Sequence, residues 1–176
     1  MTPAMISLRR FRFDDAASLV EAARESAEEV EPWMPWCHPR YSIDEARTFI
    51  ASAEGAWDGK VGYEMAIVRA EAEPDAGILG VCGLNQIRPG RVANVGYWVR
   101  TSATGAGVAT EAVGRLARFA FAETDLERLE IVVAIGNRAS ARVAEKAGAA
   151  LEGIVLDRLQ LHGRSHDAWV YVLSRS

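Results

Sequence analysis

The segment from residue 92 to residue 111 constrains this chain more than any other, and it reads V-A-N-V-G-Y-W-V-R-T-S-A-T-G-A-G-V-A-T-E. Its apolar start predicts a strand over 92–99, and its alanine-rich end predicts a helix from Val108. Gly105 and Gly107 lie between them and let a ligand approach the backbone N–H groups. The helix start adds unpaired donors and a partial positive charge. The segment therefore predicts a phosphate-binding junction.

The composition is that of one globular domain spanning residues 1–176. Hydrophobic residues make up 49% of the chain and the mean hydropathy is −0.02, which is typical of soluble proteins. The net charge of −4 gives no general attraction to nucleic acid or to a membrane surface. No apolar run reaches the ~20 residues of a membrane span. Residues 1–12 lack a signal-peptide pattern, and Cys37 and Cys82 favour reduced thiols, so we expect a cytoplasmic location.

Hydrophobic periodicity predicts an ordered series of strands and helices. The series begins with a strand over 6–13 that carries a slip or bulge, a helix from Asp14 or Asp15 to about Val30, and a helix after the capping box that starts at Ser42. Strands over 63–68, 78–87 and 92–99 follow, then a helix over 108–120, a strand over 129–134, a helix between Asn137 and Gly148, and a hairpin of strands over 154–161 and 168–173. This order predicts a mixed α/β sheet with helices on both faces.

A series of different short motifs extends along nearly the whole chain. They are Gly96-Tyr97-Trp98-Val99, Gly105-Ala106-Gly107-Val108-Ala109-Thr110-Glu111-Ala112, Phe119-Ala120-Phe121, Asn137-Arg138-Ala139-Ser140, Glu145-Lys146-Ala147-Gly148, Glu152-Gly153, and Gly163-Arg164 with Asp167. Each is common alone, but the ordered set at these spacings is specific. It resembles the GCN5-related N-acetyltransferase (GNAT) superfamily, and most of all the RimJ/RimL-type branch that acetylates the N-termini of ribosomal proteins.

The resemblance implies a GNAT fold, with a central, mostly antiparallel sheet of six to seven strands that splays at the cofactor site and has helices on both faces. It implies that acetyl-CoA binds in the wedge between the strand ending near Val99 and the strand over 129–134. The Gly105 loop would receive the pyrophosphate, and Val99 would hold the pantetheine arm like an added strand. No metal is expected. The residues expected to contact acetyl-CoA are Val99, Arg100, Thr101, Gly105, Ala106, Gly107, Val108, Ala109, Asn137, Ser140 and Lys146.

The implied activity is acetyl transfer to a primary amine, which attacks the thioester directly without a covalent enzyme intermediate. The resemblance favours a protein or peptide N-terminal α-amine as the acceptor. The alternatives are a small amine (an amino acid, polyamine or antibiotic) and, in another class, a CoA-binding protein without turnover. Ser140 is the candidate for stabilising the leaving thiolate. The alternative is that its hydroxyl only belongs to the first turn of a helix and has no chemical role. Dimers are frequent among such proteins, so a homodimer is expected by analogy alone.

The acceptor side is expected to involve two groups of residues. Trp33, Trp36 and His38 follow the first helix, where proteins of this type shape the acceptor pocket. Asn94 and Tyr97 lie on the strand that borders the expected wedge. The tryptophans would serve equally well as packing between two helices.

The chain departs from the family pattern at two functional positions. Ser102 stands where a Gln or Arg is usual, and Arg100 is the candidate replacement for that phosphate contact. Asn94 stands where many relatives carry Glu, and an amide does not accept a proton at neutral pH. The chain therefore has no carboxylate at the position where such proteins commonly carry the general base.

The sequence alone does not identify another residue as the general base. The candidates are Glu64, Asp157, Asp167 and His38, and Asp167 also fits a role in capping the last hairpin. An α-amine has a pKa of ~8, so a large fraction is already neutral near pH 7.5. We therefore expect deprotonation assisted through water and a preference for α-amines over lysine side chains.

Other chemistries fit the chain less well. Cys37-His38 and the pair His162 and His166 lack the further ligands that a metal site needs. Thr110 occupies the place of the third glycine in a dinucleotide fingerprint. The chain also has no G-x-x-x-x-G-K-[ST] loop, which disfavours a kinase or NTPase.

Overall fold

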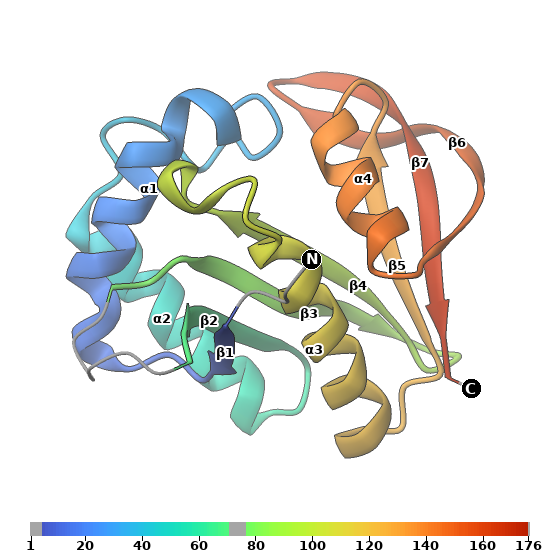
Figure 1. The fold of residues 1–176 in the computed structure, drawn as a ribbon, viewed down its shortest axis with the longest axis horizontal. Coiled ribbons are helices and arrows are strands. Elements are labelled where there is room, and N and C mark those ends of the chain that lie inside the picture. Colours follow the sequence, from blue (N-terminus) through green and yellow to red (C-terminus); the bar gives the residue numbers. More distant parts are fainter. Residues whose placement is uncertain (1–4, 71–76, 176) are drawn as a thin grey trace.

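The computed structural model describes residues 5–70 and 77–175, whose strands form one seven-stranded sheet in the order β1-β2-β3-β4-β5-β7-β6 (Figure 1). Every neighbouring pair is antiparallel except β4 and β5, which are parallel. The predicted mixed sheet is thus confirmed. The strands are β1 (Ile6–Arg9), β2 (Tyr63–Arg69), β3 (Gly80–Arg88), β4 (Val92–Val99), β5 (Arg128–Ala134), β6 (Ala150–Leu161) and β7 (Arg164–Ser174).

The described residues also form four α-helices: α1 (Ala16–Val30), α2 (Ile43–Asp58), α3 (Val108–Glu123) and α4 (Arg138–Lys146). Two of them begin at caps that the sequence predicts. The Ser42 Oγ accepts the Glu45 amide at 3.2 Å while the Glu45 carboxylate accepts the Ser42 amide at 2.8 Å. The Asn137 side chain accepts the Ser140 amide at 3.2 Å. None of these helices is both long and apolar enough to cross a membrane.

Alternation along the strands divides the core into two clusters, one on each face of the sheet. On β2, Met65 belongs to the cluster that contains Leu116 of α3. Its neighbour Ala66 belongs to the cluster that contains Leu19 of α1 and Ile50 of α2. Successive strand residues point to opposite faces, so one strand supports both layers. Helices therefore cover both faces, as the sequence predicts.

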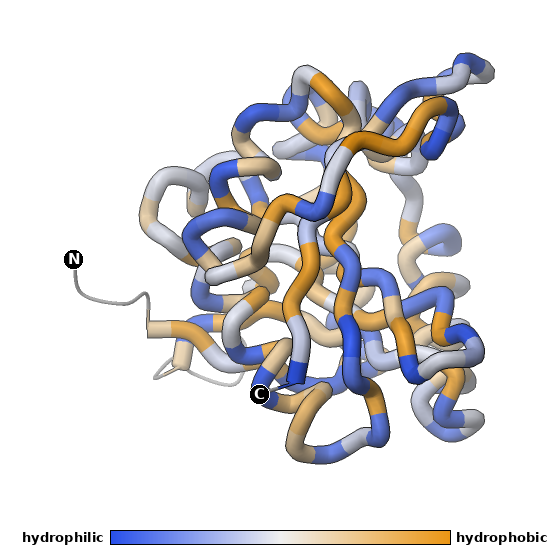
Figure 2. Tube along the Cα trace, turned by 90° about the vertical axis from the view of Figure 1, so that its right-hand side faces the viewer, coloured by the Kyte–Doolittle hydropathy of each residue, from blue (hydrophilic) through white to orange (hydrophobic). Residues whose placement is uncertain are grey.

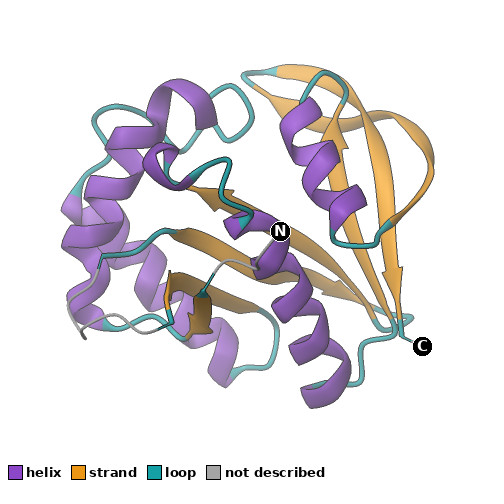
Figure 3. Cartoon of the chain, viewed as in Figure 1, coloured by secondary structure: helices purple, strands orange, loops and turns teal. Residues whose placement is uncertain are grey.

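The sheet splays between β4 and β5. These two strands pair only from Val92, opposite Arg128, to Asn94, opposite Glu130. β5 remains paired with β7 as far as Ala134. Figures 1 and 3 show β4 and β5 side by side near the C-terminus and apart toward α4. The edge of β4 beyond Asn94 therefore keeps unpaired backbone groups beside the opening, where the predicted wedge lies.

Two elements differ from the sequence prediction. β1 ends at Arg9 instead of continuing to residue 13. The reason is Asp15, whose carboxylate accepts hydrogen bonds from the Arg9 guanidinium and the Arg12 amide, each at 2.7 Å, and turns the chain into a short 3-10 helix over Phe13–Asp15. The final hairpin begins earlier than predicted, at Ala150. Its tight turn is His162 and Gly163, whose φ angles of 50° and 74° suit a two-residue type I′ turn.

The outer strand β6 leaves large apolar side chains exposed, namely Leu151, Ile154, Val155 and Leu156. Figure 2 faces this side of the molecule and shows hydrophobic stretches on the near strands. The register of β6 shifts twice, between Leu151 and Gly153 and between Val155 and Leu159. Such irregularities make a sheet edge a poor template for a further strand.

Candidate functional site

The loop between β4 and α3 has the backbone that the sequence predicts for an anion site. Gly105 and Gly107 have φ angles of 76° and 78°, in the left-handed region that favours glycine. A Cβ added at either glycine would meet nothing within 4 Å, so open space lies in front of the loop. α3 starts at Val108, and the amides of its first turn have no acceptor within the helix. The loop and the helix start together present N–H donors to that space.

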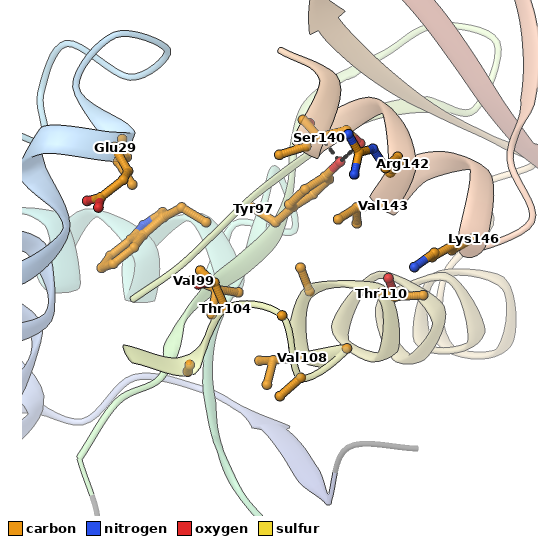
Figure 4. Close-up of a pocket in the computed structure, with 18 of the residues that line it drawn as sticks. Glu29, Tyr97, Val99, Thr104, Val108, Thr110, Ser140, Arg142, Val143 and Lys146 are labelled. Atoms are coloured by element: carbon orange, nitrogen blue, oxygen red, sulfur yellow. Dashed lines mark hydrogen bonds between the residues drawn. The ribbon is translucent and has the colours of Figure 1, made fainter. Parts of the chain in front are cut away.

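A cavity of about 560 Å³ lies beside this loop; we call it the loop cavity. β4, α3 and α4 surround it (Figure 4). Arg142 and Lys146 of α4 bring positive charge to it, and Figure 4 shows Lys146 directed toward the first turn of α3. Its lining includes these sequence-predicted residues: Trp33, Tyr97, Val99, Gly105, Ala106, Gly107, Val108, Ala109, Asn137, Ser140 and Lys146.

Tyr97 and Ser140 bring two hydroxyl groups together in the loop cavity. The Tyr97 hydroxyl donates to the Ser140 carbonyl oxygen at 3.0 Å and lies 2.9 Å from the Ser140 Oγ (Figure 4). Burial raises the pKa of Tyr97 to about 12, so the phenol stays neutral at physiological pH. A phenol has one proton, and the carbonyl bond uses it. The Ser140 hydroxyl therefore keeps its own proton for the Tyr97 oxygen or for a ligand.

A second cavity, of about 680 Å³, lies on the face of the sheet that α1 and α2 cover. We call it the aromatic cavity because Trp36, Tyr41, Phe49 and Trp98 line it. The Trp36 ring packs edge-on against Tyr41 and Trp98, with both centroid distances 5.5 Å. Its acidic lining consists of Asp44, Glu45 and Glu64.

The two cavities meet at β4. Met34, Tyr97 and Trp98 line both of them. A group entering from the loop cavity and a group entering from the aromatic cavity would therefore approach each other beside Tyr97. This is the place where the Ser140 hydroxyl lies.

Glu64 is the candidate base that lines the aromatic cavity, as Tyr97 does. Its Oε1 accepts a hydrogen bond from Asn85 Nδ2 at 3.1 Å, and the Asn85 Oδ1 accepts one from Asn94 Nδ2 at 2.9 Å. Burial raises the pKa of Glu64 above its ordinary value, although the Asn85 bond acts in the opposite direction. Asn94 itself does not line either cavity within the described residues, and its side chain donates to Asn85 instead.

The other three candidate bases lie elsewhere. His38 Nε2 is 3.0 Å from the Glu45 carboxylate, and His38 is absent from the described lining of both cavities. The Asp167 carboxylate accepts the Asp157 amide at 2.9 Å within the last hairpin. This bond supports the capping role of Asp167 over the role of a base.

The structure corrects the expectation for Arg100. Its guanidinium donates to Glu21 at 2.7 Å and also to Glu25, both on α1, and it does not line the loop cavity as described. Thr101 is likewise directed to α1, because its amide donates to Ser26 Oγ at 3.0 Å and its hydroxyl to Glu29 at 2.9 Å. The acidic face of α1 binds this segment, so the structure directs the Arg100 guanidinium to Glu21 and Glu25 and away from the loop cavity.

Some lining residues were not predicted from the sequence. Arg142 lies one turn before Lys146 on α4, and this i,i+4 pair of basic residues on one helix face was an available signal. Asp44, Thr48 and Ser52 of α2 line the aromatic cavity, and their i,i+4 spacing marks one face of that helix. No motif identifies them, because that face is recognised only once α2 is placed against the sheet.

Comparisons with known proteins agree with this geometry. The family model of the acetyltransferase (GNAT) domain matches residues 6–150. "Putative ribosomal N-acetyltransferase YdaF" of Bacillus subtilis is 29% identical over 170 residues, which are 96% of this chain and 90% of that protein. The structure of a "putative ribosomal-protein-serine acetyltransferase" from Vibrio cholerae superposes with a TM-score of 0.83 and 25% identity, over 99% of this chain and 96% of that one.

The fold is also that of Mycobacterium smegmatis RimJ in complex with CoA-disulfide, with a TM-score of 0.86 and 24% identity over 97% of this chain and 82% of RimJ. The family match spans most of the chain, and it includes β1 to β5, the glycine loop and the helices that build the site. The protein therefore belongs to the GNAT family of acetyl-transferring enzymes.

Proposed function

We propose that this enzyme transfers the acetyl group of acetyl-CoA to the N-terminal α-amine of a protein or peptide. The observation that carries the proposal is the meeting of the two cavities at Tyr97, where the Ser140 hydroxyl lies. One cavity offers donors for a phosphate-bearing ligand, and the other offers an aromatic and acidic surface for an amine.

The residues of the loop cavity fit acetyl-CoA. The amides around Gly105 and Gly107 would hold the pyrophosphate, and Arg142 and Lys146 would balance its charge. The unpaired edge of β4 would hydrogen-bond the amide groups of the pantetheine arm, in the manner of an added strand. The M. smegmatis RimJ structure, which has this fold, is a complex with a CoA-disulfide.

The residues of the aromatic cavity fit a cationic amine terminus. Asp44, Glu45 and Glu64 attract a positive charge, and Trp36 and Trp98 offer aromatic faces to a side chain or to the ammonium group. The B. subtilis and V. cholerae relatives carry names that describe acetylation of ribosomal proteins. This supports a protein N-terminus as the acceptor.

The chemistry assigned to the residues is direct transfer. Acetyl-CoA supplies an activated thioester. The acceptor nitrogen forms a C–N bond to the carbonyl carbon, the C–S bond breaks, and the electron pair leaves on sulfur. The Ser140 hydroxyl donates a hydrogen bond to that sulfur, and Tyr97 holds Ser140 in place. The hydroxyl pair, at the point where the two cavities meet, favours turnover over simple CoA binding.

A small amine is the second candidate acceptor. The aromatic cavity, at about 680 Å³, has a size that suits a small molecule with an aromatic or apolar part. A protein acceptor would instead place only its first residues there.

The test is turnover of acetyl-CoA against three matched acceptor sets. These are peptides with a free N-terminus, the same peptides with the N-terminus blocked but a lysine present, and small amines. Free-thiol release and mass spectrometry of the product would report the reaction. We expect acetylation at the α-amine of the first set, whereas modification of small amines alone would select the second candidate. Acetyl-CoA binding without any turnover would contradict the proposed function.

A further inference from the structure

Glu64 lies on β2, in line with two glycines of the neighbouring strands. The register pairs Glu64 with Gly83 of β3, and Gly83 with Gly96 of β4. A Cβ added at Gly83 would lie 2.0 Å from Glu64 Oε2 and 2.5 Å from Glu64 Cδ. The carboxylate therefore lies over the backbone of Gly83 and extends from β2 across β3 toward β4. No other residue type at position 83 would leave this path free.

Two asparagines hold one oxygen of this carboxylate and leave the other free. Asn85 donates to Oε1, and Asn94 donates to Asn85. Oε2 receives no hydrogen bond from residues 5–70 or 77–175, and the carboxylate has no ion-pair partner among them. In this described part, no side-chain oxygen is both fully buried and without a partner. Oε2 must therefore face open space.

That open space is the aromatic cavity, which Glu64 lines together with Gly96 and Tyr97. The other titratable groups that line this cavity or face Glu64 are Tyr41, Asp44, Glu45, Cys82 and Tyr97, and His38 lies 3.0 Å from the Glu45 carboxylate. Burial of Cys82 on β3 raises the pKa of that thiol, and Glu64 raises it further. A carboxylate without a cation partner in such surroundings holds a proton more firmly than an exposed one.

We propose that Glu64 is the general base of this enzyme and removes the proton from the acceptor amine through its free Oε2. The inference rests on the proposed acetyl transfer and names the group that makes the amine reactive. Asn94 cannot take the proton, but it orients Asn85, and Asn85 orients Glu64. Both asparagines are thus positioning residues. The carboxylate function is supplied from β2 instead of from position 94 of β4.

The proton balance of the step is complete. An amine that arrives as an ammonium ion first loses a proton to Glu64. Glu64 passes this proton to water before the amine attacks. As the C–N bond forms and the C–S bond breaks, the second excess proton of the nitrogen passes to the regenerated Glu64 carboxylate. The thiolate leaves with the hydrogen bond of Ser140 and takes a proton from solvent. Glu64 returns its proton to water, so the enzyme is unchanged after each cycle.

The test is Glu64→Gln, because a glutamine oxygen can still accept the Asn85 bond and the fold should be kept. At neutral pH we expect kcat to fall ~10²- to 10⁴-fold, which is the usual contribution of a general base. The affinity for acetyl-CoA should not change, because Glu64 does not line the loop cavity. The matched control is Glu123→Gln, which removes a carboxylate from an exposed position at the end of α3 and should leave kcat unchanged.

A pH profile separates a base from a residue that only attracts the acceptor. In the wild type, kcat should rise through an inflection that is present for every acceptor, whatever the pKa of its amine. Glu64→Gln should lose this inflection, and its rate should follow the neutral fraction of each amine. Glu64→Asp, which keeps a carboxylate one methylene shorter, should restore part of kcat together with the inflection.

Four outcomes would overturn the assignment. An unchanged kcat in Glu64→Gln, or an inflection that persists in it, would return the reaction to water-assisted deprotonation. A rise in the KM of the acceptor at constant kcat would show that Glu64 only attracts the cation. If the wild type acetylates no amine although it binds acetyl-CoA, the proposed function and the role of Glu64 fall together. If the wild type acetylates an amine and Glu64→Gln does so equally well, the role of Glu64 is wrong but the proposed function stands.

Discussion

Two residues that are 43 positions apart in the chain share a hydrogen bond at the centre of the site, Tyr97 and Ser140. The Asn137 cap fixes the start of α4, and this places Ser140 in the first turn. Tyr97 then binds both the carbonyl and the side chain of Ser140. The backbone of Ser140 is thus held by two separate elements, and its hydroxyl keeps one proton that it can donate to a ligand.

Replacing Ser140 with alanine tests that donor. Ser140→Ala should lower kcat ~10- to 1000-fold, the range for a single acid or oxyanion donor, with little change in the affinity for acetyl-CoA. Steady-state kinetics and calorimetry would measure the two quantities. Tyr97→Phe should lower kcat less, and it should add little to Ser140→Ala in the double variant, because both act through one hydroxyl. A wild-type kcat in Ser140→Ala would reduce Ser140 to a helix-start residue.

At the scale of elements, the loop before α3 is the proposed site for the pyrophosphate of acetyl-CoA, and Gly105 lies in it. Gly105→Val should weaken acetyl-CoA binding strongly, since the side chain would occupy the open space and the φ of 76° disfavours valine. Gly163→Val is the matched control. Gly163 has a φ of 74° and equally open surroundings, but it lies in the last hairpin. Calorimetry should show weak binding only in Gly105→Val, and equal affinities in two folded variants would refute the loop as the pyrophosphate site.

The contact between α1 and the end of β4 is a second feature at this scale. Glu25 accepts hydrogen bonds from Arg100 and from the Ser102 amide, and these lower its pKa from 4.5 to about 2. A carboxylate with a lowered pKa in the folded state adds stability above its unfolded pKa and loses it as the pH falls. The window for Glu25 is therefore about pH 4.5 down to about 2.

Glu25→Gln should accordingly lower the Tm at neutral pH, and its difference from the wild type should shrink as the pH falls through that window. Thermal unfolding followed at several pH values would measure this. Glu28→Gln is the control, since Glu28 is an exposed residue of the same helix and surface substitutions usually change stability by less than ~0.5 kcal/mol. A Tm difference for Glu25→Gln that does not depend on pH would contradict the assigned ion pair.

The whole molecule consists of two parts of a sheet that separate at the site. β1 to β4 form one part and β5, β7 and β6 the other, and three residue pairs join them. The loop cavity lies where they diverge, with lining residues from β4 on one side and α4 on the other. A ligand in this cavity would therefore bridge the two parts.

Acetyl-CoA should stabilise the whole fold through this bridge. At about 100 times Kd, binding to the native state alone adds ~2.7 kcal/mol to the free energy of unfolding. Thermal unfolding would report the rise, and hydrogen exchange would locate it. We expect hydrogen exchange to slow at residues 95–99 and 105–110 by more than it slows in α2. The helix α2 serves as the reference for the general stabilisation of the fold. Protection confined to other elements would place the cofactor elsewhere.

Local patterns were enough to predict most of the fold and the glycine loop beside the loop cavity. The glycines at 105 and 107, the capping residues Ser42 and Asn137, and the alternation along the strands each act over a few residues, and the structure has the corresponding turn, helix starts and faces. Such signals are read from neighbours in the chain, because a helix repeats every 3.6 residues and a strand every two. Arg142 was the residue that such a pattern could have added.

The contacts around Glu64 and Arg100 were decided by the tertiary structure alone. Glu64 was one of four candidate bases until the register of β2 and β3 placed its carboxylate over Gly83. Arg100 looked free to bind phosphate until α1 brought Glu21 and Glu25 to it. Strand register and helix docking depend on the burial of whole faces, so they determine which distant side chains meet, and no short stretch of sequence contains that information.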